Sequence, residues 1–127
     1  MTDSDRLVQA ARAAQLKAYC PYSRFPVGAA VMAEDGTIFA GCNVENASYG
    51  LAMCAERNAV NTMVAAGYRR IKLAAVAARA AKPCGACRQV LLEFSTPKTK
   101  LILAGPRSRR AVKVFNLLPE PFHPKDL

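Results

Sequence analysis

Two short stretches of the sequence place cysteines where they can share one metal ion. MCAERNAV (53–60) contains Cys54, and KPCGACRQV (82–90) contains Cys84 and Cys87 directly after a proline. Cysteines at positions i and i+3 project from the same side of a first helical turn, so the second pair can bind one ion together. If the two expected helices lie side by side, Cys54 supplies a third thiolate. This ligand set leaves the fourth tetrahedral position of Zn²⁺ open to water, as in a catalytic zinc site.

The charge of such a centre requires compensation, because the thiolates together outweigh the charge of Zn²⁺. The N-termini of both expected helices supply positive potential. Arg57, three positions after Cys54, shares its helix face and is the side chain that we expect to compensate the charge. Arg88, next to Cys87, is the alternative.

Glu56 decides between a catalytic and a structural metal site. Residues two positions apart in a regular helix are separated by roughly 200° around the axis. Cys54 and Glu56 can therefore meet one ion only at a helix entrance, where Glu56 can act as a general base and acid for water beside the metal. The alternative is a four-cysteine site completed by Cys20 or Cys42. We expect instead that these two residues, which lack partners at ligand spacing, are small buried hydrophobic residues.

The hydrophobic pattern predicts an α/β fold in which helices cover a sheet. Thr2 and Asp5 resemble a capping box at the start of the first helix. We expect a three-layer α-β-α arrangement around a central mixed sheet of about five strands, with residues 1–127 forming a single domain. The expected elements are a helix (4–18), a β-hairpin (27–44), a helix (54–66) ended by Gly67, a buried strand (71–78), a helix (84–94), a strand (99–104) and a last short strand (111–115).

Composition narrows the protein class further. The chain has an odd number of cysteines, 5, and a polar N-terminus, and its apolar runs are too short to span a bilayer. We therefore expect a soluble cytoplasmic protein with reduced thiols and no membrane contact. Much of the net charge of +9 comes from residues 69–113, where Glu93 is the only acid. This segment could attract phosphate, but a solvated basic face is the simpler interpretation, since no aromatic residues are interleaved to stack bases.

Further motifs carry a resemblance to a known family. The pattern Cys-x-Glu followed by Pro-Cys-x-x-Cys is that of the zinc deaminases. The chain resembles the small, homotetrameric, zinc-dependent cytidine deaminases over nearly its whole length. A cysteine at the first metal-ligand position, Cys54, is similar to the pattern of the nucleoside deaminases of this type. The motifs are SRFPVGAA (23–30), GCNVENASYG (41–50), CAER (54–57), PCGACRQVLLEF (83–94) and LLPEPF (117–122).

The resemblance implies hydrolytic deamination of cytidine and 2′-deoxycytidine to uridine and 2′-deoxyuridine, with release of ammonia, in pyrimidine salvage. One Zn²⁺ per subunit activates a water that attacks C4 of the ring, and Glu56 shuttles protons. The implied zinc ligands are Cys54, Cys84 and Cys87, and the implied substrate-binding residues are Phe25, Asn43, Glu45 and Ala55, together with Tyr49 and Phe122 from a neighbouring subunit.

Asn43 and Glu45 indicate the form of the substrate. They stand two positions apart at a strand end, so their side chains share a face and can bind sugar hydroxyls. The carboxylate of Glu45 would repel a phosphate on the same hydroxyl, which favours a free nucleoside over a 3′-nucleotide or a polymer.

Three alternatives to a nucleoside deaminase stay open. They are a related deaminase of a cytosine-bearing antibiotic or another amino-heterocycle, a deaminase that binds or edits RNA, and a structural zinc module. The segments RAAKP and GPRSRR (105–110) are more basic than the family pattern and leave room for another partner or substrate preference.

Overall fold

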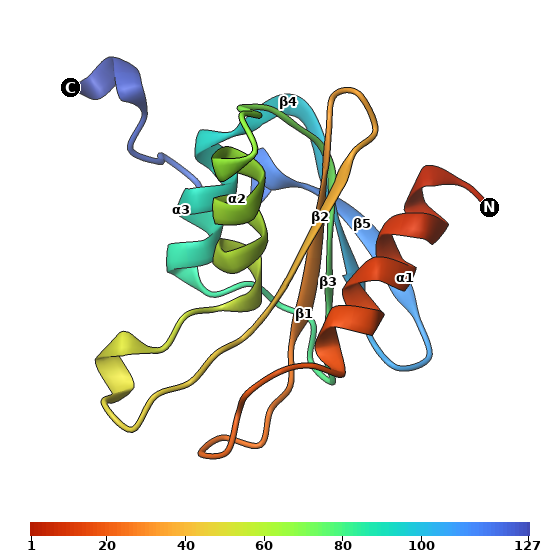
Figure 1. Cartoon of the computed structure of the whole chain (residues 1–127). Helices are drawn as coiled ribbons and strands as arrows, with labels where there is room; N and C mark the ends of the chain where they lie inside the picture. Colours follow the sequence, from red (N-terminus) through yellow and green to blue (C-terminus); the bar gives the residue numbers. More distant parts are fainter.

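The computed structural model describes residues 1–127 and contains one five-stranded sheet between two helical layers (Figure 1). The helices are α1 (Asp3–Gln15), α2 (Ala55–Ala65) and α3 (Gly85–Glu93), with short 3₁₀ helices η1 (Tyr49–Leu51), η2 (Val114–Leu117) and η3 (Pro124–Asp126). The strands are β1 (Gly28–Ala33), β2 (Ile38–Cys42), β3 (Ile71–Ala77), β4 (Ser95–Ala104) and β5 (Arg109–Lys113). None of the helices has the length and apolar content needed to cross a bilayer.

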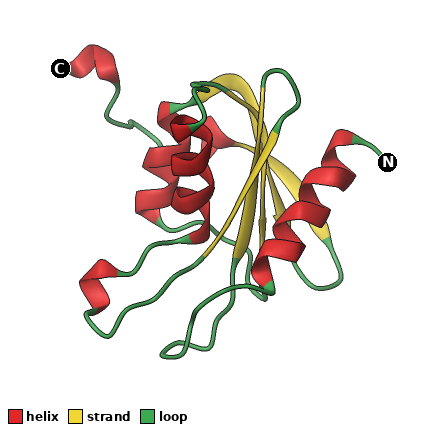
Figure 2. Cartoon of the chain, in the orientation of Figure 1, coloured by secondary structure: helices red, strands yellow, loops and turns green.

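The sheet is mixed, in the order β2-β1-β3-β4-β5. Strands β3 and β4 run parallel, and every other neighbouring pair is antiparallel. Helix α1 covers one face of the sheet, and α2 and α3 lie together on the opposite face (Figure 2). This arrangement confirms the predicted three-layer fold class and the predicted order of elements.

Helix α1 begins where the capping box predicts. The backbone N–H of Asp5 donates to the Thr2 hydroxyl at 3.1 Å, and the backbone N–H of Thr2 donates to the Asp5 carboxylate at 3.0 Å. The helix ends at Gln15, before the predicted end at residue 18, because the chain there turns to pair Tyr19 with Val44. Its buried face packs Leu7 and neighbouring residues against β1, β3 and β4.

The second core lies under α2 and α3, and it explains the continuous apolar runs in the sequence. Every residue of β1 is buried, and β3 is buried at most positions, because both faces of these central strands are covered by helices. Alternate residues point into the two cores, so that Ala74 and Val76 meet α2 and α3 while Ala75 meets α1.

Two glycines set the position of α2. Gly67 adopts the left-handed conformation (φ 98°) just after the helix, as expected of a residue that ends one. Gly41 in β2 lets the helix approach closely, because a Cβ built there would lie 2.6 Å from the Ala59 backbone nitrogen. The start of α2, and therefore Cys54, depends on this contact.

The end of the sheet differs from the prediction. Strand β5 covers residues 109–113 instead of 111–115, with Arg110 paired to Leu103. An edge strand that is mostly exposed does not need apolar side chains. Arg109 and Arg110 can therefore belong to β5 and pair through their backbones with β4. Val114, predicted as strand, is instead the first residue of η2 and is fully buried in the core. Strand β4 also begins earlier than expected, at Ser95.

We expect Gly41→Ala to destabilise the protein by about 1–3 kcal/mol, because the added methyl group meets the backbone of α2. Gly50→Ala is the matched control, since a Cβ at Gly50 meets nothing within 4 Å. Chemical denaturation of both variants measures the difference. Equal unfolding midpoints would contradict a close contact between β2 and α2.

Candidate active site

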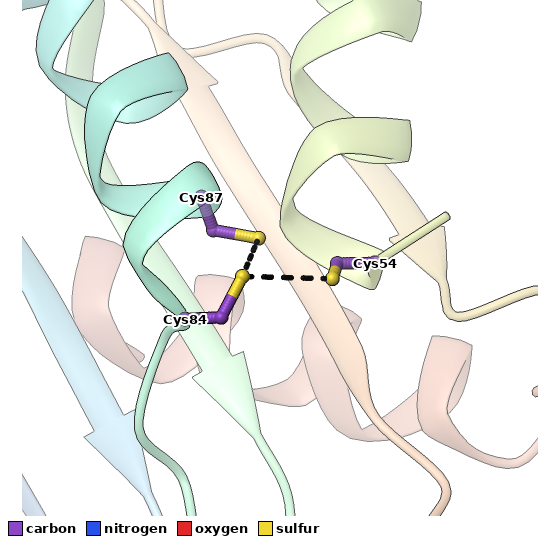
Figure 3. Close-up of side chains that lie close together, drawn as sticks. All are labelled: Cys54, Cys84 and Cys87. Atoms are coloured by element: carbon purple, nitrogen blue, oxygen red, sulfur yellow. Dashed lines mark hydrogen bonds between the residues drawn. The ribbon is translucent and has the colours of Figure 1, made fainter. Parts of the chain in front are cut away.

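Three sulfurs converge at the start of α2 and α3 (Figure 3). The Sγ atoms of Cys54, Cys84 and Cys87 all lie within 4.8 Å of one another. The distance from Cys54 to Cys84 is 3.8 Å, and that from Cys84 to Cys87 is 3.5 Å. Two thiolates bound at about 2.3 Å to a tetrahedral Zn²⁺ lie roughly 3.8 Å apart. The sulfurs therefore have the spacing that this ion requires.

Helix caps produce this convergence. Cys54 and Cys84 are the N-cap residues of α2 and α3, with extended backbone conformations, and Cys87 lies in the first turn of α3. Because an N-cap residue is not yet helical, Cys54 and Glu56 can face the same point, as the sequence predicted. The positive ends of both helices are also directed at the sulfurs.

Arg57 is the cation that contacts the sulfurs. Its Nη2 donates to the Cys54 Sγ at 3.4 Å, and its buried Nε has no hydrogen-bond partner. Arg88, the alternative, instead donates to the carbonyls of Pro83 and Leu117, at 2.9 and 3.0 Å. It ties α3 to the C-terminal segment, so Arg57 is the one of the two arginines that contacts a sulfur.

The thiol groups of Cys54 and Cys87 differ in how readily they lose a proton. The hydrogen bond with the Cys87 thiol, aided by Arg57, lowers the pKa of Cys54 to about 5. The same hydrogen bond, together with burial, raises the pKa of Cys87 above its ordinary value. Cys54 is therefore the first of the two to become a thiolate.

Glu56 is buried beside this cluster, with 5% of its surface exposed. Burial raises the pKa of its carboxyl group to about 7, and the charge of the Cys54 thiolate acts in the same direction. A carboxyl group in this range can accept and return a proton near neutral pH.

A cavity of about 410 Å³ opens onto the sulfurs. It brings together Cys54, Cys84 and Glu56 with four of the residues predicted to bind substrate. Those four are Phe25, Asn43, Glu45 and Ala55. Val27, Val76 and Ala78 make much of the remaining wall apolar, as is usual in small-molecule sites.

Asn43 and Glu45 also hold the loop that precedes β1. Asn43 accepts from the backbone N–H of Val27 and donates to the Phe25 carbonyl, both at 2.9 Å. The Glu45 carboxylate accepts from the backbone N–H groups of Tyr22 and Ser23 at 3.0 and 3.1 Å. The Ser23 hydroxyl also donates to it, which lowers the pKa of Glu45. Each side chain retains hydrogen-bonding capacity for a ligand.

Ser23 is the residue that the sequence analysis missed. It lines the cavity and binds Glu45, yet its only signal was its place in SRFPVGAA. A hydroxyl group in a loop has too many possible partners for sequence to indicate the correct one.

Tyr49 and Phe122 do not line this cavity. Tyr49 is 75% exposed and lines an adjoining cavity of about 270 Å³ with Tyr22 and Glu45. Phe122 is 58% exposed, and its carbonyl accepts from the Gln89 side chain at 2.9 Å.

The expectation for Cys20 and Cys42 was wrong. Both are partly exposed, because one lies in a loop and the other ends the edge strand β2. Neither joins the three clustered sulfurs, which excludes the four-cysteine site within this chain.

Comparisons with known proteins agree with this site. The family model described as the cytidine and deoxycytidylate deaminase zinc-binding region matches residues 1–103. A cytidine deaminase of Sporosarcina psychrophila is 43% identical over 129 residues, covering 98% of this chain and 95% of that protein. One from Halalkalibacterium halodurans is also 43% identical, covering 98% of each.

Solved structures show the same fold. The crystal structure of cytidine deaminase from Burkholderia pseudomallei superposes with a TM-score of 0.90 and 47% identity, covering 96% of this chain and 100% of that chain. The crystal structure of cytidine deaminase from Mycobacterium tuberculosis superposes with a TM-score of 0.83 and 40% identity, covering 96% of this chain and 98% of that chain. The fold and the sulfur cluster define a zinc-binding deaminase. More closely, the chain belongs to the cytidine and deoxycytidylate deaminase family.

We expect the purified protein to contain about one zinc ion per chain, and Cys84→Ser to lose most of it because a thiolate ligand is removed. Cys20→Ser is the matched control and should keep its zinc, since Cys20 lies outside the cluster. Elemental analysis by mass spectrometry measures the content. Equal zinc in the two variants would contradict the assigned ligands.

Proposed function

We propose that this chain is a cytidine deaminase that hydrolyses cytidine and 2′-deoxycytidine to uridine and 2′-deoxyuridine and releases ammonia, as a step of pyrimidine salvage. The burial of Glu56 beside three clustered sulfurs, in a cavity that also holds Asn43 and Glu45, is the observation that carries the proposal. The names of its relatives support the same substrate class.

Zn²⁺ held by Cys54, Cys84 and Cys87 supplies a Lewis acid that makes water nucleophilic when it is bound. In the proposed reaction, Glu56 takes a proton from this water and passes it to N3 of the pyrimidine as C4 is attacked. Glu56 then carries the second proton of the water to the departing amine, so that ammonia leaves and a carbonyl group forms at C4. One carboxyl group near its own pKa can serve both transfers.

The other cavity residues are proposed to orient the nucleoside. The Phe25 ring packs against the base, and Ala55, fully buried at the start of α2, bounds the pocket next to Cys54. Asn43 and Glu45 bind the sugar hydroxyls through the hydrogen-bonding capacity that remains after their contacts with the loop before β1. The charge of Glu45 disfavours a phosphate on the 3′ position.

We further propose that residues 1–127 act as one domain in a homotetramer whose subunits share active sites. Tyr49 and Phe122 are large aromatic residues that are mostly exposed and lie outside the cavity of their own chain. Exposed aromatic side chains of this kind are typical of surfaces that a partner covers. A cytoplasmic location stays a prediction.

Glu56→Gln should retain zinc but lower kcat by about 10²–10⁴-fold, because an amide cannot accept the proton. Glu34→Gln, in the exposed turn between β1 and β2, is the matched control and should act as the unaltered protein does. The loss of ultraviolet absorbance on conversion of cytidine to uridine follows the rate. A zinc-loaded Glu56→Gln variant with normal turnover would overturn the proton-shuttle role.

Glu45→Gln should raise KM for cytidine by about tenfold, since it removes a charge-assisted hydrogen bond, while relaxing discrimination against 3′-phosphorylated analogues. Ser23→Ala separates this effect from loop anchoring, because it removes the Ser23 hydroxyl and leaves the carboxylate in place. Steady-state kinetics with both substrates tests the assignment. An unchanged KM in Glu45→Gln would remove this residue from the sugar site.

A further inference from the structure

A second cavity, rich in basic residues, adjoins the active-site cavity. Its volume is about 350 Å³, and it lies between the segment that connects β3 to α3 and the turn that connects β4 to β5. Lys82 lines both cavities, so the two spaces are neighbours. Four cationic side chains line the second cavity, together with Ser108; they are Arg79, Lys82, Arg109 and Arg110.

The charge in this cavity is largely uncompensated. No carboxylate lines it. Arg109 pairs with Asp5 at 2.6 Å, but Arg79, Lys82 and Arg110 take part in none of the salt bridges of the chain. Like charges gathered in a concave space repel one another and raise the local concentration of anions. An anionic ligand would relieve this repulsion.

One wall of the cavity is held in place by α1. The Arg12 guanidinium donates to the Gly105 carbonyl at 3.0 Å, and the Asp5–Arg109 pair ties the start of β5 to the same helix. Within the turn, the Gly105 N–H donates to the Ser108 carbonyl at 2.9 Å. A site fixed in advance loses less entropy when a ligand binds.

The opposite wall reaches the substrate pocket. The Arg79 guanidinium carbon lies 4.8 Å from the centre of the Phe25 ring, the ring proposed to pack on the base. Arg79 and Lys82 therefore stand between the two cavities, where they can contact a charged group attached to a molecule in either one.

We propose that Arg79, Lys82 and Arg110 form a binding site for a phosphate group beside the deaminase centre. Guanidinium and ammonium groups are the side chains suited to phosphate oxygens, and the Ser108 hydroxyl adds a neutral donor. The phosphate has two possible sources: the 5′-phosphate of a pyrimidine nucleotide whose base enters the active site, or a separate phosphate-bearing molecule. The 5′ position is compatible with Glu45, which acts against a phosphate on the 3′ position.

Titration of the zinc-loaded protein with inorganic phosphate tests the site, by calorimetry at constant ionic strength. We expect saturable binding that Arg110→Gln weakens by about tenfold, because one charge-assisted contact is lost. Arg107→Gln is the matched control, since Arg107 is an exposed arginine of the same turn that does not line the cavity. No saturable binding, or equal weakening in both variants, would overturn the proposal. This measurement does not depend on deaminase activity.

Kinetics then identify the source of the phosphate, and this step rests on the proposed function. If the substrate carries it, 2′-deoxycytidine 5′-monophosphate is deaminated, and Arg110→Gln raises its KM by about tenfold without changing that of 2′-deoxycytidine. If a separate molecule carries it, the monophosphate is a poor substrate while phosphate still binds in the presence of 2′-deoxycytidine. If neither 2′-deoxycytidine nor its 5′-monophosphate is deaminated, that result counts against the proposed function alone, because phosphate binding is measured independently.

Discussion

The sulfurs of Cys54, Cys84 and Cys87 repel one another once they are deprotonated, because negative charges within 4.8 Å interact strongly in a partly buried space. Each surrounding feature offsets part of this repulsion. A bound divalent metal ion would neutralise most of the charge, two helix N-termini add positive potential, and Arg57 contacts one sulfur directly. Glu56 is buried beside the same sulfurs. Burial, aided by the charge of the Cys54 thiolate, raises the pKa of its carboxyl group, which is the property that the proposed proton transfer requires.

The sheet makes this convergence possible. Strands β3 and β4 are parallel, so the chain must cross over between them, and it does so through α3. Helix α2 lies beside α3 on the same face, drawn close to β2 at Gly41. The two helices therefore begin next to each other, and their cap residues meet over the cavity. A site built from helix caps on a buried sheet is held more rigidly than one built from loops alone.

The active-site cavity has chemically different neighbours. Glu45 and the aromatic residues Tyr22 and Tyr49 line one adjoining hollow. Lys82, which also lines the active-site cavity, leads into the basic cavity. A ligand in the active-site cavity is thus exposed to the negative charge of Glu45 and to the positive charge of Lys82. This polarity favours one orientation of a molecule that carries hydroxyl groups at one position and a phosphate at another.

The amino-acid sequence alone determined the features that depend on residues close together in the chain. These include the capping box of α1, the two cysteine-bearing helix starts, the β-hairpin around Gly36 and the buried central strand. Their geometry follows from the helical and strand periods, so spacing is sufficient to predict them. The three-layer fold followed from the order of these elements.

Only the tertiary structure decided the contacts between segments that lie far apart in the chain. Helix spacing favoured Arg57 over Arg88 as the cation beside the sulfurs, but packing decided that Arg88 donates to a carbonyl of the C-terminal segment while Arg57 contacts the Cys54 sulfur. The partial exposure of Cys20 and Cys42 and the contact of Ser23 with Glu45 were likewise set by chain segments distant in sequence. The same holds for the basic cavity, whose cations come from segments more than twenty positions apart. Such contacts depend on how the layers pack, and no local period encodes that packing.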